Sequence, residues 1–227
     1  MIMKSSRRVL LVALAVAVAG LILSTAWLVR DASRQAVSGP ADFGPVRAGA
    51  DRQSLPTVPP AGASAGRPGR SPAVPAQVAQ PRTLSLPRLG VTAPVDPVAV
   101  SDDGQVEVPD DPRRVGWYRF SPPPGSKQGS AVLVGHVDSD GRGLGVLVAL
   151  NDVRSGDQVL VERADGSTVE YRVTARRAID KSALAGSGAF QREGPAVLTL
   201  ITCTGAYLPD AGGYQQNLVV TAVEART

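Results

Sequence analysis

The sequence contains very few of the residues on which several classes of protein depend. Among 227 residues there is one cysteine, Cys203, and one histidine, His136. One cysteine excludes an intramolecular disulfide, and these two residues are too few for a zinc site built from four Cys or His ligands. We expect no metal and no cofactor, since no phosphate loop or dinucleotide fingerprint occurs either. Aromatic residues make up only 4% of the chain, although its 43% of hydrophobic residues are enough for a core.

Positive charge is also scarce where a nucleic acid would need it. The formal net charge is +4, but residues 1–81 carry nine Lys or Arg against three Asp or Glu. Residues 82–227 carry fifteen basic and seventeen acidic side chains. A folded region with this balance lacks the concentrated positive field that phosphate binding requires. We therefore expect no nucleic-acid partner.

A long apolar run lies near the N-terminus. Residues 9–29 contain no charged side chain, and their number matches the roughly 20 residues that cross a bilayer. Lys4, Arg7 and Arg8 precede the run. Positive charges there predict that residues 1–8 form a cytoplasmic tail. The run predicts a single-pass signal-anchor helix in the plasma membrane, with the rest of the chain extracellular. A cleaved signal peptide with a site near Ala26 is the alternative.

The next segment, residues 30–81, is rich in Pro, Ala and Gly. Its apolar residues follow neither a 2-residue nor a 3.6-residue period, so the segment has no face to bury. We predict a disordered linker here, which would hold the following domain away from the membrane.

Residues 82–227 have the pattern of one β-rich domain. Short β-type runs alternate with turn residues, and Asp165-Gly166 between two runs is a strong hairpin signal. The pattern predicts an all-β domain with short helices, closed into a barrel that leaves no exposed edge. The strands expected are 83–86, 130–135, 158–162, 168–175, 196–203 and 217–223; the short helices expected are 111–115 and 144–150.

The single cysteine and the single histidine occupy similar places in this pattern. Cys203 ends an apolar, β-branched run and is followed by Thr204-Gly205. His136 ends another buried-looking run. A free thiol is only slightly ionised near neutral pH, and a neighbouring imidazole is its usual activator. Each residue taken alone fits an ordinary structural role as well, so position alone leaves function and structure as open alternatives.

Two short motifs separate these alternatives. Leu133-Val134-Gly135-His136 resembles the His box of sortases, and Thr199-Leu200-Ile201-Thr202-Cys203 resembles their TLxTC box. The likeness extends over about residues 82–225, through Leu84–Val91, Gly116-Trp117-Tyr118, Pro124-Gly125 and Gly156-Asp157. Together with the apolar N-terminal run, the chain most resembles the class F sortases of high-GC Gram-positive bacteria.

This resemblance implies an eight-stranded barrel and a cell-surface cysteine transpeptidase. Cys203 would attack the Thr–Gly peptide of an LPxTG-like sorting signal on a surface protein and form a thioacyl-enzyme. His136 would protonate the leaving amine and then deprotonate the incoming amine of a cell-wall precursor or another nucleophile. Thr202 would help to orient the acyl oxygen.

One position departs from the family. Sortases carry an Arg on the last strand, in a context like Tyr-Arg-Asp-Asn, whereas this chain has Tyr214-Gln215-Gln216-Asn217. Gln215 is a neutral hydrogen-bond donor without charge. We expect Gln215 to donate its amide hydrogen into the Cys203 groove, with Arg142 as an alternative source of charge. A sortase-like domain with weak or no catalysis, which binds sorting peptides or acts as an accessory surface module, is therefore the second functional hypothesis. A non-catalytic barrel with a buried Cys203 is the third.

Overall fold

A computed structural model describes residues 41–45, 78–139 and 141–225. The predicted cytoplasmic tail (1–8), the predicted anchor (9–29) and most of the predicted linker (30–81) lie outside the described residues. Within the described ranges, no helix has the length and apolar character needed to cross a membrane.

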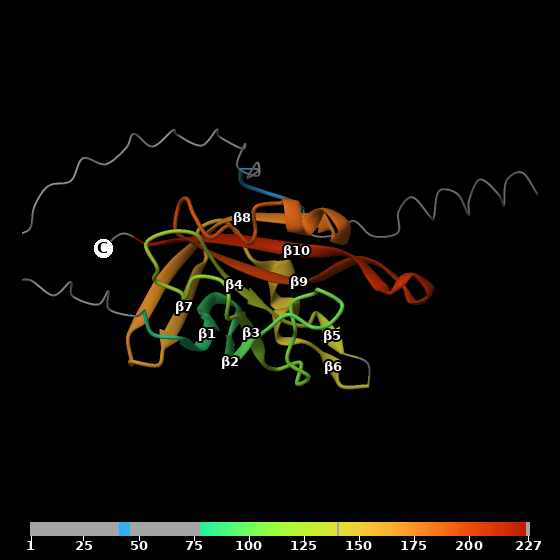
Figure 1. The fold of residues 1–227 in the computed structure, drawn as a ribbon, viewed down its shortest axis with the longest axis horizontal. Helices are drawn as coiled ribbons and strands as arrows, with labels where there is room; N and C mark the ends of the chain where they lie inside the picture. The colour runs from blue at the N-terminus through green and yellow to red at the C-terminus, as the bar shows by residue number, and fades with distance from the viewer. Residues whose placement is uncertain (1–40, 46–77, 140, 226–227) are drawn as a thin grey trace, which may run out of the picture. The chain divides into compact units, whose positions relative to one another are not determined.

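Eight strands of the described chain form one closed barrel (Figure 1). Their order around the barrel is β1-β2-β3-β4-β9-β10-β8-β7, and β7 pairs with β1 to close it. The strands are β1 (Pro81–Leu86), β2 (Val91–Val98), β3 (Val115–Tyr118), β4 (Ser130–Val134), β7 (Gln158–Arg163), β8 (Thr168–Asp180), β9 (Val197–Leu208) and β10 (Gly213–Glu224). The closed eight-stranded β-barrel expected from the sequence is confirmed.

The remaining elements are short. β5 (Asp138–Ser139) and β6 (Gly143–Leu144) form a separate two-stranded sheet. Four 3₁₀ helices connect the described strands: η1 (Pro87–Leu89), η2 (Val146–Asp152), η3 (Lys181–Gly186) and η4 (Pro209–Ala211). Helix η2 confirms the helix expected over 144–150 with a shift of two residues.

The helix expected over 111–115 is wrong. The Asp111 carboxylate accepts a hydrogen bond from the backbone N–H of Arg113 at 3.0 Å, which stabilises a turn. Strand β3 then begins at Val115 and pairs with both β2 and β4. Cross-strand pairing on both sides therefore outweighs the local helix signal of an Asp-Pro start.

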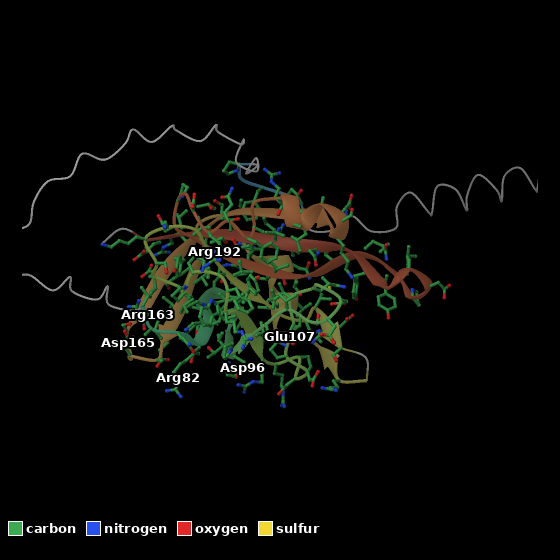
Figure 2. The ribbon with its side chains drawn as sticks, viewed as in Figure 1. Arg82, Asp96, Glu107, Arg163, Asp165 and Arg192 are labelled. Atoms are coloured by element: carbon green, nitrogen blue, oxygen red, sulfur yellow. The ribbon has the colours of Figure 1, made fainter. Side chains whose placement is uncertain are left out.

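The hairpin predicted at Asp165-Gly166 is present between β7 and β8. Gly166 has a φ of 78°, in the left-handed region that favours glycine. The Asp165 carboxylate accepts a hydrogen bond from the Ser167 N–H, and its oxygen lies 3.8 Å from Arg163 Nε. Figure 2 shows Arg163 and Asp165 together at this turn.

Alternate residues of the central strands pack on opposite faces of the barrel wall. Leu198 and Leu200 of β9 belong to the interior cluster, which is built mainly from Leu and Val. Ile201 belongs to a second cluster with Val134 and Val219 on the outer face, and Leu184 and Phe190 pack against it. Side chains of a strand point alternately to its two faces. Cys203, two residues after Ile201, therefore belongs to the outer face.

Residues 41–45 differ from the expectation of a disordered linker. Phe43 forms an isolated antiparallel bridge with Arg176 of β8, through backbone hydrogen bonds of 3.0 and 2.9 Å. The buried Arg176 guanidinium donates to Ala41 O at 2.8 Å and lies 5.2 Å from the centroid of the Phe43 ring. Phe43 pairs with the part of β8 that lies beyond the residues paired with β7. Because this contact depends on a distant strand, the local composition of residues 41–45 could not predict it.

Candidate active site

Strand register brings the two candidate catalytic residues to one place. Strands β4 and β9 are parallel neighbours, with Val134 opposite Ile201, and Gly135 N donates to Ile201 O at 3.1 Å. His136 and Cys203 each follow two residues after that pair. They therefore lie at the same end of adjacent strands, and both line one cavity.

Two cavities of the described chain border Cys203. The smaller cavity, about 380 Å³, is lined by both His136 and Cys203, together with Asp138, Lys181, Tyr207 and Tyr214. The larger cavity, about 540 Å³, is lined by Cys203, Thr202, Asn217 and Lys181, and its walls are mostly apolar. Its apolar walls include Val100, Val108, Tyr118, Leu184 and Phe190. Cys203 therefore has open space on two sides.

The His136 ring is held by a backbone carbonyl. Its Nε2 atom lies 3.0 Å from Pro109 O. A carbonyl oxygen only accepts hydrogen bonds, so Nε2 carries the hydrogen in this contact. In the neutral imidazole, Nδ1 is then the atom that accepts a proton, which is the property that a general base needs.

The environment of the Cys203 thiol opposes its ionisation. Burial raises the pKa of Cys203, the Lys181 charge lowers it, and the Asp138 charge raises it. The first of these effects is the largest, because an apolar wall disfavours a thiolate. At neutral pH the thiol is therefore mostly protonated, and attack on a substrate requires a base such as His136.

Thr202 lines the larger cavity, but its side chain lies differently from that of Cys203. It is only 2% exposed, and alternation along β9 directs it toward the barrel interior with Leu200. Among the described residues its hydroxyl has no hydrogen-bond partner. A role for this hydroxyl in orienting the acyl oxygen stays a prediction.

Gln215 differs from the sequence expectation in what its amide contacts. Gln215 Nε2 donates to Gly213 O, in the first residue of β10, at 2.6 Å and to Ala211 O, in the last residue of η4, at 3.3 Å. An amide nitrogen has two hydrogens, so both are engaged there. Gln215 lines neither of the cavities that border Cys203. The amide therefore stabilises the hairpin turn in this structure and does not donate toward the thiol.

The register of the hairpin explains this orientation. Tyr214 is opposite Tyr207, whereas Gln216 is opposite Thr204, so the pairing shifts between these two positions. Such an irregularity re-aims side chains, and a count of residues along the sequence cannot anticipate it. The alternative source of charge, Arg142, lines neither cavity and donates from Nη1 to Asp110 O at 2.6 Å.

Three residues at the site were not found from the sequence. Asn217 is directly opposite Cys203 on β10 and is 9% exposed. Tyr214 donates from its hydroxyl to Asp138, and this hydrogen bond raises the pKa of Tyr214 to about 12. Lys181 lines both cavities. The only available signal was that Lys181 is one of just three lysines in the chain.

The β9–β10 hairpin supplies one wall of the smaller cavity. In Figure 1 its connecting end, in orange to red, extends past the other barrel strands. Tyr207 and Tyr214 form an edge-to-face pair there, with ring centroids 5.0 Å apart, and Tyr207 is 60% exposed. The hydrogen bond from Tyr214 to Asp138 joins this wall to β5.

Solved structures with a similar fold are sortases. Sortase C1 from Streptococcus agalactiae is 20% identical, covers 64% of this chain and 67% of that chain, and has a TM-score of 0.50. Sortase A from Corynebacterium diphtheriae, lid mutant, is 20% identical over 67% of this chain and 75% of that chain, with a TM-score of 0.49. Sortase C1 of GBS Pilus Island 1 is 21% identical, with a TM-score of 0.49, and the match spans 64% of each chain. The present chain thus matches less than two thirds of the length of the last of these.

A family comparison covers most of the described chain. Comparison with curated proteins gave no match. The sortase domain model matches residues 84–225, which contain β2 to β10, the second half of β1, His136 and Cys203. Because this match spans more than half of the sequence, the chain belongs to the sortase family of cysteine transpeptidases.

Proposed function

We propose that this chain is an active sortase that cleaves an LPxTG-like sorting signal between Thr and Gly and transfers the acyl group to an amine. The observation that carries the proposal is the parallel β4–β9 register, which brings His136 and Cys203 to the lining of one cavity. The thiol also borders an apolar cavity of about 540 Å³, large enough to hold part of an extended peptide.

The residues divide the proposed reaction in the following way. His136 takes the thiol proton, and the Cys203 sulfur bonds to the scissile carbonyl carbon while the π electron pair moves to oxygen. Collapse of this intermediate re-forms the carbonyl and breaks the C–N bond, and the imidazolium protonates the leaving amine. His136 then removes a proton from the incoming amine, which attacks the thioester and releases the thiol.

Location and subtype follow as parts of the same proposal. The uncharged run 9–29, with Lys4, Arg7 and Arg8 before it, supports a single-pass anchor with the barrel outside the plasma membrane. The substrates would be surface proteins with sorting signals, and the acceptor an amine of the cell wall.

The His and TLxTC boxes together with such an anchor support a class F sortase. Protease added to intact protoplasts should remove the barrel; protection until lysis would overturn this orientation.

The decisive experiment traps the covalent intermediate. Purified full-length chain is mixed with a peptide containing LPxTG, and its intact mass is measured. We expect an added acyl mass that hydroxylamine removes, and no such mass with Cys203→Ala. Lys127→Gln, which changes an exposed loop residue outside both cavities, is the matched control and should acylate normally.

Two observations favour the second hypothesis, a peptide-binding module with weak catalysis. Burial raises the pKa of the Cys203 thiol, and Gln215 brings no charge to it. Under this hypothesis the peptide would bind, as measured by fluorescence anisotropy, without forming the hydroxylamine-sensitive adduct over many hours. Binding with no adduct would therefore replace the proposed activity with the accessory role.

A further inference from the structure

Lys181 is the one Lys or Arg among the described residues that line the two cavities at Cys203. It appears in both linings, whereas His136 lines only the smaller cavity and Asn217 only the larger one. Lys181 therefore borders the space on both sides of the thiol.

The sheet register accounts for this position. Ile179 of β8 is opposite Asn217 of β10, and Asn217 is opposite Cys203 of β9, so the three residues form one row across three strands. Asp180 keeps an extended backbone, with φ of −58° and ψ of 139°. Lys181, the first residue of η3, follows directly and lies two residues after Ile179, so it starts beside the row that contains Cys203. A lysine side chain is long enough to extend from there toward the thiol.

The ammonium group is not already used by a carboxylate. Within the described part of the chain, Lys181 forms no ion pair, and the neighbouring Asp180 carboxylate accepts a hydrogen bond from Gln216 Nε2 at 2.9 Å. The other charged or titratable groups that line the two cavities are His136, Asp138, Tyr118, Tyr207 and Tyr214. Asp138 accepts the Tyr214 hydroxyl and is the one carboxylate in either lining.

We propose that Lys181 is the cationic residue of this active site, stabilising the Cys203 thiolate and the negative charge that develops on the acyl oxygen during thioacylation. The second part rests on the proposed function. Lys181 keeps its proton throughout, because the protons that move pass between the thiol, His136 and the two amines. Its contribution is electrostatic: the sulfur lone pair forms the C–S bond while the carbonyl π pair moves to oxygen, so the negative charge passes from sulfur to oxygen beside the cavities that Lys181 borders.

The charge–charge attraction that Lys181 exerts on Cys203 agrees with this role, since it lowers the pKa of a thiol that burial raises. Lys181 is exposed, so water screens part of its charge. We therefore expect a moderate effect, smaller than that of a fully buried cation.

The test compares Lys181→Gln, Lys181→Arg and the control Lys127→Gln in the full-length protein. Because Cys203 is the only cysteine, alkylation by neutral iodoacetamide reports on this thiol alone. The rate constant is measured against pH, with circular dichroism to verify folding. Lys181→Gln should raise the apparent thiol pKa by roughly half a unit to one unit, while Lys181→Arg and Lys127→Gln should leave it near the wild-type value.

Thioacylation by the sorting peptide supplies the second readout. Lys181→Gln should slow it about 10-fold, and Lys181→Arg should retain most of the rate, because removal of one donor at a developing oxyanion costs up to about 10²–10³. If Lys181→Gln changes neither the alkylation profile nor the acylation rate, the proposal is overturned. It is equally overturned if Lys127→Gln shifts the profile as much, since the effect would then be one of net charge.

The alkylation arm separates this inference from the proposed function. If the wild-type chain forms no thioacyl adduct but Lys181→Gln still raises the thiol pKa, the proposed activity is wrong. The stabilisation of the Cys203 thiolate by Lys181 is then still supported. If the adduct forms and Lys181→Gln leaves alkylation and acylation unchanged, the activity stands and the role of Lys181 fails.

Discussion

Two regions of the barrel position side chains near Cys203 in different ways. One is the pair of strand ends of β4 and β9, and the other is the turn of the β9–β10 hairpin. At the strand ends, an unbroken parallel register with Val134 opposite Ile201 determines where His136 and Cys203 lie. In the hairpin, the register shifts between Tyr214 and Gln216, and the Gln215 amide is directed to the turn carbonyls. A residue held by continuous pairing can be located by counting along the strand, whereas one beside an irregularity cannot.

The largest expected effect concerns the residues held by the strand ends. His136→Gln should lower the thioacylation rate by about 10²–10⁴, because it removes the base from a thiol that burial keeps protonated. Single-turnover acylation followed by intact mass measures the loss. A similar loss for Gln215→Ala would remove the contrast between the two regions.

The two regions should also differ in stability. Leu200→Ala, in the interior of β9, should lower the free energy of unfolding by about 2–5 kcal/mol, because it leaves a cavity in the barrel core. Leu208→Ala is the matched control, since Leu208 is 48% exposed at the far end of the same strand. It should change stability by less than about 0.5 kcal/mol. Urea unfolding followed by tryptophan fluorescence tests both; equal losses would contradict this assignment of the core.

Two tyrosines extend the comparison to high pH. Burial raises the pKa of Tyr171 in the barrel to about 12, and hydrogen bonding to Asp138 raises that of Tyr214 in the hairpin to about 12. Their pKa in the unfolded chain is about 10, so the unfolded state loses protons first as pH rises. Each tyrosine therefore contributes stability that is present below pH 10 and is lost as the pH rises toward 12.

Between about pH 10 and 12, the free energy of unfolding of Tyr171→Phe should fall less than that of the wild type. The difference should be at most about 2.7 kcal/mol. The substitution also removes the acceptor of the Gly125 N–H, so its stability at neutral pH should fall by about 1 kcal/mol. Tyr214→Phe should flatten the curve less, because water screens a group near the surface. Denaturant unfolding across this pH range measures both, and an equal response from the two variants would refute the distinction.

The smallest expected effect is that of Gln215→Ala. Its amide hydrogens bond to the turn, so its loss should change the thioacylation rate by no more than about 2-fold and affect mainly the hairpin. Gln215→Arg should likewise bring little gain in a hairpin with this register. A rise of 10-fold or more with Gln215→Arg would show that position 215 reaches the reacting atoms and would reinstate the expectation drawn from the sequence.

Several elements were predictable because their cause is local. The six strands expected from β-type runs are present, and Asp165-Gly166 makes the turn that its positive-φ tolerance favours. Strand β2 was not expected: its sequence, with Pro94 and Pro97, reads poorly as a strand. Pairing with β1 and β3 on its two sides overrides that local signal. The bridge of Phe43 to Arg176 depends in the same way on residues far away in the sequence.

The amino-acid sequence by itself indicated the barrel class, the two candidate residues Cys203 and His136, and the family, because alternation and two short motifs are local properties of the chain. Tertiary structure alone decided which other side chains meet Cys203. Asn217 lies opposite Cys203 through the pairing of β10 with β9, and Lys181, just beyond β8, lines both cavities at the thiol, over separations in sequence that no short motif spans. Gln215 turns away because one shift in register re-aims it, and register depends on the long-range pairing of whole strands.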